Sequence, residues 1–348
     1  MKNESLKNDK KKIGTIDKYY IFHIIKIVSI FILLSSFKKD IFEIIKKNEI
    51  KVCLCVIGKK ENLYVKEFIS HYKRIGYDKI FIYDNNDIND EKFEEVIKSE
   101  IDSGFVSIIN YRGYKGLKIR PQFDAYKNCY QKYNHKFEWL SFFDFDEFLE
   151  FKYKGMTIKK FLKTKKFEKC QSVKINWIIY GNNNSLLYED KPLKERFNIA
   201  GLNNLDNKHI KSTVRGNLSI NYWNNMKDPH SSSYKEFISC SSSGKIISSS
   251  SPFNYPPDYK NAYIKHYRYK SFEEHCLKIK RARSDYTSKE NKKDIMQLIK
   301  DLYLQNKGND KKIKIMKTIF KEDFLAIKSK LIGQKEKKIM NNRKLSAI

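Results

Sequence analysis

The stretch WLSFFDFDEFLE, residues 139–150, joins a run of large apolar side chains to a cluster of acids. Its first five residues have the character of a strand that is apolar on both faces, as in a parallel or mixed sheet. Asp144, Asp146 and Glu147 follow at once, and isolated carboxylates are costly to bury unless a cation or several donors lie beside them. This stretch therefore predicts a core strand whose end faces positive charge.

The segment before it carries alternating strand and helix patterns. Residues 50–58 are a short apolar run that ends in glycine, which predicts a first strand and a turn. Apolar residues at helical spacing follow over residues 65–75, and Gly76 is placed to end that helix. Residues 79–87 predict a second strand that ends in acids and amides. Together they form a βαβ unit, whose crossover should be right-handed.

A second round of the same pattern completes the sheet. Residues 92–100 predict a helix, residues 105–109 a strand, and residues 121–133 a helix with proline in its first turn. Further on, residues 173–177 alternate as in a half-buried strand, and residues 272–279 predict a helix. These elements indicate an α/β fold, with a Rossmann-like mixed sheet flanked by helices and peripheral helices at the C-terminus.

Two remaining stretches predict loops that face solvent. Residues 180–185 are rich in amides, and residues 230–251 are rich in serine, with a hairpin expected around Ser243 and Gly244. The chain divides by composition into a basic N-terminal segment with an apolar helix (1–49), a main domain (50–290) and a charged helical extension (291–348).

Three loops are expected to meet at one edge of the sheet: residues 57–61, 84–87 and 144–147. Ligands of open α/β sheets bind in the crevice outside the carboxyl ends of the strands. Asp144 and Asp146 lie two apart on an extended chain, so they should face the same side. A hard cation that bridges phosphate oxygens needs only one or two protein carboxylates, which favours Mg²⁺ or Mn²⁺ carried with a nucleotide diphosphate. The alternative is an acidic turn without chemistry.

Composition narrows the class of protein. The formal net charge is +29 over 348 residues, which points to polyanionic partners, yet lysine, isoleucine, asparagine and tyrosine are abundant everywhere, as in a general compositional bias. No nucleic-acid-binding motif is present, so no nucleic acid partner is expected. The turn GKKEN after the first strand is no glycine fingerprint of a dinucleotide-dependent oxidoreductase. A glycosidase would need two carboxylates that oppose each other, and Asp144 and Asp146 are too close in sequence for that.

The six cysteines show no metal or disulfide spacing, and we expect them to be reduced and buried. Residues 19–37 have the length of a membrane span, with lysines before them, but Lys26 divides the apolar run. A signal anchor, a helix packed on the domain and an interfacial helix all remain open. We therefore expect a membrane-associated protein, at the cytosolic face or single-pass anchored, with a possible contact to the membrane surface.

Four segments resemble, in their usual order, the glycosyltransferase family 2 and family 92 type enzymes: residues 51–87, WLSFFDFDEFL, INWIIYG and YIKHYRYKSFEEHCLKIKRARSD. The resemblance covers about residues 50–290. It implies a GT-A fold, a nucleotide-sugar donor with UDP-sugars favoured, Mn²⁺ or Mg²⁺, and inversion at the anomeric carbon. The acceptor would be a glycan, glycolipid or glycoprotein, and the transferred group a hexose.

The same resemblance assigns roles around the donor. Asp146 would bind the metal, and Asp144 would face the ribose or share the cation. The other donor-facing positions follow the first two strands and open the helix at residue 121: Ile57, Glu61, Asp84, Asn85, Arg120 and Gln122. Lys60 stands where the group usually has asparagine.

Later positions supply cations and a base. His266 matches a late histidine that reaches the metal or the diphosphate, and Arg215 and His230 resemble a basic pair that binds diphosphate or acceptor. Gly216 stands where the group often has proline. The acceptor hydroxyl needs a general base, for which the candidates are Glu147, the nearest to the motif, Asp190 and Glu195. Glu147 is as well explained as a surface acid or a helix cap. Tyr267 and Lys270 are expected to be packing and surface residues.

The sequence thus predicts a metal-dependent glycosyltransferase. The competing interpretation is a catalytically silent GT-A domain that binds sugars or acts as a scaffold.

Overall fold

The structure is a computed structural model that describes residues 30, 31, 34, 49–113, 121–218, 230, 237–248, 250–281, 288–329 and 331. The chain divides into two compact units, residues 1–49 and 50–348. The predicted apolar helix over residues 19–37 lies almost wholly outside the described residues. Within the described ranges, no helix combines the length and the apolar character that crossing a membrane requires.

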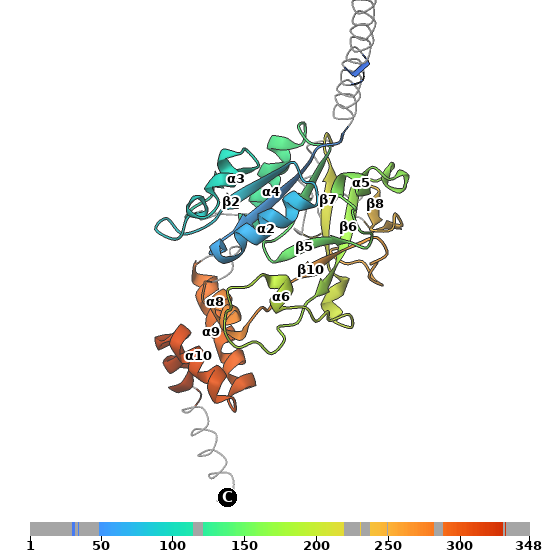
Figure 1. The fold of residues 1–348 in the computed structure, drawn as a ribbon. Helices are drawn as coiled ribbons and strands as arrows, with labels where there is room; N and C mark the ends of the chain where they lie inside the picture. The colour runs from blue at the N-terminus through green and yellow to red at the C-terminus, as the bar shows by residue number, and fades with distance from the viewer. Residues whose placement is uncertain are drawn as a thin grey trace, which may run out of the picture. The chain divides into compact units, whose positions relative to one another are not determined.

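One mixed sheet organises the second unit (Figure 1). Across the described residues its main path runs in the order β3-β2-β1-β4-β7-β6-β10-β5, and a hairpin of β8 and β9 pairs with β6. The strands are β1 Val52–Gly58, β2 Lys79–Asp84, β3 Val106–Asn110, β4 Trp139–Phe142, β5 Glu147–Phe151, β6 Ser172–Ile179, β7 Ile210–Arg215, β8 Ser239–Ser241, β9 Ile246–Ile247 and β10 Ala262–His266.

Strand direction decides which side chains meet at each edge. The strands β1, β2, β3 and β4 are parallel, β7 runs antiparallel to β4, and β6 and β10 return to the direction of β1. The carboxyl ends of β1, β4, β6 and β10 therefore share one edge with the start of β7. This edge is where ligands of open α/β sheets bind.

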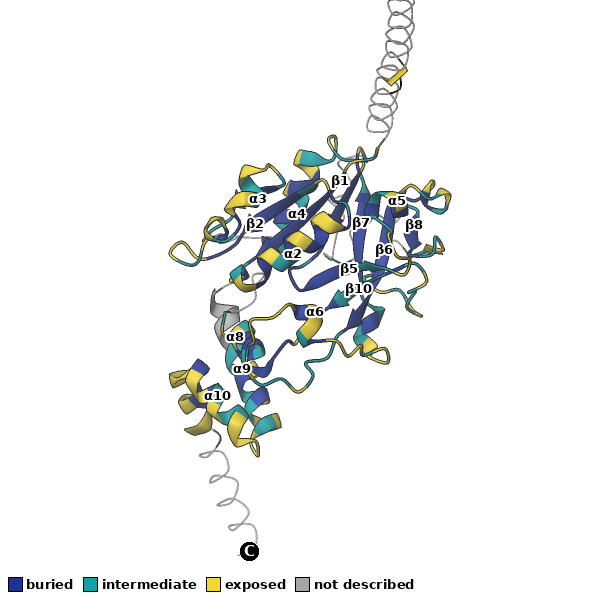
Figure 2. Cartoon of the chain, viewed as in Figure 1, coloured by how far each residue is buried: buried dark blue, intermediate teal, exposed yellow. Residues whose placement is uncertain are grey.

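Helices cover both faces of the parallel half. The α-helices are α2 Asn62–Arg74, α3 Lys98–Asp102, α4 Pro121–Tyr133, α5 Ile158–Leu162, α6 Leu193–Arg196, α8 Phe272–Lys280, α9 Ser288–Asn306 and α10 Asp310–Phe320. Phe68 and Tyr72 of α2 pack in one core with Val52 and Leu54, while Tyr126 of α4 packs in a second core with Cys53. Figure 2 shows the strands as the buried layer and the outer sides of the helices as exposed. A third cluster joins α8, α9 and α10.

The predicted α/β architecture is confirmed, and several elements have nearly the predicted bounds. The helix that begins at Pro121, the hairpin around Gly244 and the helix from Phe272 are all present. Residues 92–100 differ, because a short 3₁₀ turn precedes α3. β6 is also not half-buried as expected, since all eight of its residues are buried. The buried Asn176 side chain of β6 has hydrogen-bond partners within the protein: it donates to the backbone carbonyl oxygens of Asn207 and Asn254.

The prediction of six reduced cysteines is wrong for four of them. Cys55 of β1 is bonded to Cys129 of α4, and Cys170 is bonded to Cys240 of β8. The partners lie 74 and 70 residues apart, so no local spacing reveals them, and the packing of α4 on β1 and of β8 on β6 brings them together. Cys53 and Cys276 are free and buried, as expected.

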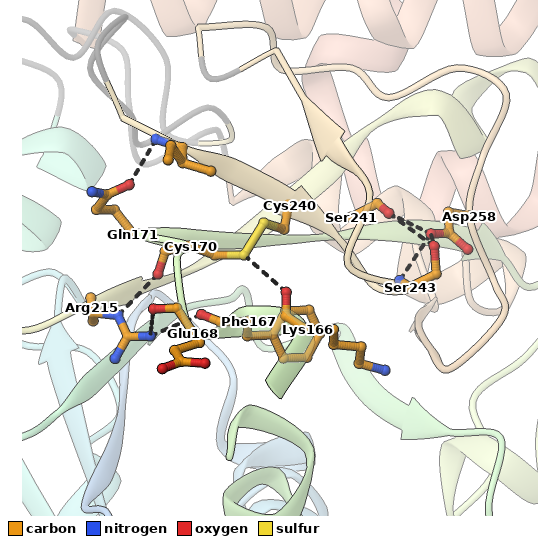
Figure 3. Close-up of a disulfide and its surroundings, with 11 residues drawn as sticks. Lys166, Phe167, Glu168, Cys170, Gln171, Arg215, Cys240, Ser241, Ser243 and Asp258 are labelled. Carbon is orange, nitrogen blue, oxygen red and sulfur yellow. Dashed lines mark hydrogen bonds between the residues drawn. A yellow bond between two sulfur atoms is a disulfide. The ribbon is translucent and has the colours of Figure 1, made fainter. Parts of the chain in front are cut away.

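The second disulfide joins Cys170, two residues before the start of β6, to Cys240 of β8 (Figure 3). It therefore lies at the end of the sheet opposite to the ligand-binding edge. Arg215, at the end of β7, donates from Nε to the carbonyl oxygen of Cys170 over 3.0 Å. Its Nη2 donates to the carbonyl oxygens of Phe167 and Glu168 at 2.9 and 3.1 Å. The guanidinium also lies 4.5 Å from the centroid of the Trp139 ring. Arg215 therefore holds the loop before β6 in place.

Removing this disulfide should destabilise the protein. The double variant Cys170→Ser/Cys240→Ser frees a loop of 70 residues in the unfolded chain, so we expect the free energy of unfolding to fall by about 2–4 kcal/mol. Urea unfolding followed by tryptophan fluorescence measures the change. Cys276→Ser, which alters a buried thiol without a bridge, is the control. Equal stability of the double variant and this control would contradict the cross-link.

Candidate functional site

A cavity of about 570 Å³ opens at the carboxyl edge of the sheet. The first strand, the loop after β4 and the end of β10 contribute to it, as do α8 and α9. Its lining residues are Ile57, Gly58, Lys59, Glu61, Gln122, Asp144, Phe145, Asp146, Trp177, His209, His230, His266, Arg268, His275, Lys278, Ile279, Arg281, Ile295 and Leu298. Both acids of the Asp-x-Asp motif lie in this cavity.

Asp144 is held by three donors from two different elements. Gln122 Nε2 and the Tyr126 hydroxyl, both on α4, donate to Oδ1 at 2.8 and 3.0 Å. The buried Lys211 Nζ on β7 donates to Oδ2 at 2.8 Å. Burial alone would raise the pKa of Asp144, but the charge of Lys211 outweighs it and lowers this pKa. Asp144 is thus an ionised carboxylate whose position is fixed by α4 and β7.

Asp146 faces a different set of partners. Lys278 Nζ on α8 donates to Oδ2 at 2.7 Å, and His266 Nε2 lies 3.5 Å from Oδ1. Burial raises the pKa of Asp146, whereas Lys278 and His266 lower it, and the net effect is a pKa well below the usual value. Phe145, between the two acids, turns into the core, where its ring centroid lies 4.8 Å from that of Phe68. Both acids line the cavity, but the predicted extended chain is wrong here: residues 144–147 form a turn, in which the Glu147 N–H donates to the Asp144 carbonyl oxygen over 3.0 Å.

The turn after β1 supplies an acid that is already paired. Glu61 Oε1 lies 2.6 Å from Arg281 Nη2, and Lys270 Nζ lies 4.0 Å from Oε2. Arg281 also donates to the carbonyl oxygen of Lys59 over 2.6 Å, which ties the end of α8 to this turn. Lys270, which was expected at the surface, is buried with its Nζ 3.5 Å from the Tyr64 ring centroid. Tyr267 is a core residue, as predicted.

Aromatic and imidazole rings form another part of the cavity lining. The Trp177 ring stacks on His209 with centroids 4.8 Å apart and lies 4.3 Å from His266. His230 meets the same indole edge-on at 5.2 Å. Burial, followed by the nearby Lys211, lowers the pKa of His230 to about 3, so this ring is neutral at physiological pH. This part of the lining is therefore flat, aromatic and uncharged on its His230 side.

Other predicted site residues lie outside the cavity lining. Asp84 is buried behind it, where Arg112 Nε donates to Oδ2 at 2.8 Å and the Asn86 side chain donates to Oδ1. Arg112 also donates to three backbone carbonyls of the loop at residues 87–91, so this pair shapes the loop. Asn85 bonds through its backbone to Gly58. Arg120 lies outside the described residues.

None of the three predicted bases lines the cavity. Asp190 and Glu195 are exposed on the segment around α6. Glu147 is fully buried at the start of β5, where Oε2 accepts from the backbone N–H of Asp144 at 2.9 Å and lies 3.6 Å from Lys211 Nζ. Burial raises the pKa of Glu147 well above its usual value, although Lys211 opposes this. Glu147 therefore supports the turn that carries the two aspartates.

Sequence reasoning missed several cations of this site. Lys211 stands in the stretch IKSTVR, where no sequence pattern marks it as buried. Lys278 and Arg281 occur in the segment KIKRAR, which reads as an ordinary charged helix end. Only the fold shows that this helix end faces Asp146 and Glu61.

The comparison with protein families identifies one match. The sequence model of glycosyltransferase family 92 matches residues 48–304. A family 92 protein of Oryza sativa subsp. japonica is 31% identical over 100 residues, which are 29% of this chain and 16% of that protein. One from Ricinus communis is 29% identical over 98 residues, covering 28% and 17%. One from Arabidopsis thaliana is 28% identical over 126 residues, covering 34% and 20%. These matches span at most a fifth of the relatives' own lengths.

Solved structures give weaker likenesses. The match to TarS of S. aureus covers 73% of this chain and 43% of the TarS chain, at 11% identity and with a TM-score of 0.33. The match to glucosyl-3-phosphoglycerate synthase of Mycobacterium tuberculosis, solved with Mn²⁺ and UDP, covers 49% of this chain and 58% of that chain, at 13% identity and with a TM-score of 0.27. Similarities of this size support no inference about the reaction. The family match, which extends over most of the chain, shows that this protein belongs to glycosyltransferase family 92.

Proposed function

We propose that this protein transfers a hexose from a nucleoside diphosphate sugar, with UDP favoured, to a glycan, glycolipid or glycoprotein acceptor. The observation that supports it best is the composition of the large cavity. It combines the two motif aspartates with four cationic side chains, Lys59, Arg268, Lys278 and Arg281. A diphosphate needs several cations, and charge-assisted hydrogen bonds from lysine and arginine are strong.

A divalent cation is part of this proposal, and the residues present fit it. Among the described residues, no group of three histidine, cysteine or acidic side chains is arranged to hold a metal alone. Asp146 and His266 nevertheless face each other across 3.5 Å, and Mg²⁺ or Mn²⁺ bound with a nucleotide takes its other ligands from phosphates and water. Asp146 and His266 would hold the ion, with Asp144 beside them. The ion would supply positive charge to the leaving diphosphate.

Cationic side chains of the protein would also stabilise the diphosphate. Lys278 is bonded to Asp146 but 37% exposed, so its flexible stem allows it to exchange the carboxylate for a phosphate oxygen. Arg268 lines the cavity with its side chain 42% exposed, and its Nη1 lies 2.6 Å from Asp206 Oδ2. Lys211 keeps Asp144 ionised and fixed. These cations would stabilise the negative charge that develops on the nucleoside diphosphate as the glycosidic bond breaks. Inversion is carried over from the family resemblance.

Titration of UDP into the full chain tests this proposal. We expect binding in the presence of Mn²⁺ and a large loss of affinity when EDTA replaces the metal, because cation and diphosphate share ligands. Isothermal calorimetry measures both, with GDP and CMP as comparison nucleotides. Absence of binding to every nucleotide would favour the alternative of a silent sugar-binding or scaffold domain.

The two disulfides bear on the cellular location. Disulfides persist in oxidising compartments and are rare in the cytosol. They support a catalytic domain that acts on the lumenal or external side of a membrane, with residues 19–37 as a single-pass anchor. A cytosolic enzyme at the membrane surface is the alternative, and it would contain these cysteines as free thiols.

A further inference from the structure

A second, smaller cavity adjoins the large one. Its volume is about 260 Å³, and its lining residues are Ile179, Gly181, Asn182, Gly201, Asn204, Tyr269, Phe272 and His275. They come from the end of β6, the loop before the 3₁₀ turn at Leu205–Lys208, and the start of α8. His275 also lines the large cavity, so the two cavities meet at this side chain.

Two asparagines, Asn182 and Asn204, line the small cavity. Asn182 Oδ1 accepts from the backbone N–H of Asn184 at 3.1 Å, and Asn204 Oδ1 accepts from the backbone N–H of Asp206 at 2.9 Å. These bonds fix which end of each amide is oxygen. Neither Nδ2 group has a hydrogen-bond partner within the described part of the chain. Both amides are therefore held in place with their donors available to a ligand.

The rest of the lining is apolar or aromatic. Tyr269 is 37% exposed, and its ring centroid lies 5.8 Å from that of His275. Phe272 is buried beside it. Among the residues that the structure describes, no acidic or strongly basic side chain lines this cavity. Burial, together with Lys278 and Arg268, lowers the pKa of His275, so its ring is neutral at physiological pH. The cavity is thus suited to an uncharged ligand that has both an apolar face and hydroxyl groups.

Two glycines keep the cavity open. A Cβ at Gly201 would lie 3.1 Å from the carbonyl oxygen of Ile179, a tight contact. A Cβ at Gly181 would lie 3.7 Å from the carbonyl oxygen of Ile199, an ordinary van der Waals distance. A side chain at residue 181 would therefore reduce the cavity without displacing the backbone.

We propose that the small cavity binds the terminal uncharged sugar ring of the acceptor. Tyr269 and Phe272 would pack against the apolar face of the ring, and Asn182 and Asn204 would donate to its hydroxyl oxygens. The reacting hydroxyl would then lie beside His275, at the opening to the donor cavity. This inference rests on the proposed glycosyl transfer and specifies its acceptor as a neutral sugar.

Saturation-transfer NMR on the full chain with bound UDP and Mg²⁺ tests the inference. The probes are glucose, galactose, mannose and N-acetylglucosamine, with glucuronic acid as a charged comparison. We expect at least one neutral sugar to bind and glucuronic acid to bind more weakly. Gly181→Val should abolish the signal, and Tyr269→Ala should weaken binding by up to about tenfold through loss of the aromatic contact. Tyr255→Ala, which removes an 81% exposed aromatic side chain outside both cavities, should change nothing.

UDP affinity, measured on the same samples, separates this inference from the proposed function. If UDP binds and no neutral sugar does, or if sugar binding persists unchanged in Gly181→Val, the acceptor site is overturned while the donor site stands. If the sugars respond to the variants as expected and no nucleotide binds, the small cavity is a sugar site and the proposed transfer fails.

Discussion

Asp146→Asn should lower turnover of the nucleotide-sugar donor by about 10²–10³-fold, the usual cost of removing one group that stabilises charge at a reacting centre. The substitution keeps the size of the side chain but removes the charge that holds Lys278 and faces His266. It also removes the carboxylate proposed to bind the metal. Release of UDP from a panel of UDP-sugars, with and without Mn²⁺, measures the effect.

Glu147→Gln is the matched control for this prediction, because it changes the neighbouring acid in the same way. Glu147 is buried, has a raised pKa and supports the turn through the backbone of Asp144, a contact that the amide oxygen of glutamine can also make. Turnover should therefore be largely retained. A loss in Glu147→Gln as large as that in Asp146→Asn would mean that Glu147 takes part in the chemistry and that its buried position changes during the reaction.

Short-range patterns were sufficient to predict the fold class and the parallel half of the sheet, but not the strands β5, β7 and β10. The apolar runs of β1, β2 and β4 and the helical spacing in α2 appear directly in the sequence, and so does the convergence of the first and third loops on one crevice. Pairings between distant residues were not predictable. Cys170 and Cys240 are 70 residues apart, and only the parallel pairing of β8 with β6 brings them together.

In the site too, positions set by local patterns were predicted, and positions set by distant pairings were not. Glu61, Gln122, Asp144, Asp146 and His266 all line the cavity, because each follows a strand or begins a helix at the carboxyl edge of the sheet. Arg215 does not, because β7 is antiparallel to β4. This direction places Lys211 at the cavity edge and Arg215, four residues later, opposite Trp139 at the far end. No strand was predicted over residues 210–215, and no local pattern in the sequence gives the direction in which such a strand runs.

Lys211→Met should lower the free energy of unfolding by about 1.5–3 kcal/mol at neutral pH, since it removes a charged hydrogen-bond donor from Asp144, whose side chain is only 31% exposed. Lys211 Nζ lies 2.8 Å from Asp144 and 3.6 Å from Glu147, and no solvent reaches its side chain. Urea unfolding measures the loss. Lys194→Met, at an exposed position on α6, is the control and should stay within about 0.5 kcal/mol of the unchanged protein.

The pH dependence of this loss tests its electrostatic origin. In the unchanged protein the pKa of Lys211 is raised, against the effect of burial, and that of Asp144 is lowered, so the pair contributes fully between the ordinary pKa values of aspartate and lysine. Without Lys211 both neighbouring carboxyls should have higher pKa values in the folded state and take up protons as the pH falls below neutral. The stability difference between Lys211→Met and the unchanged protein should therefore shrink from pH 7.5 towards acidic pH. A difference that is independent of pH would indicate lost packing in place of lost charge, and Asp144 would then need another source of its fixed position.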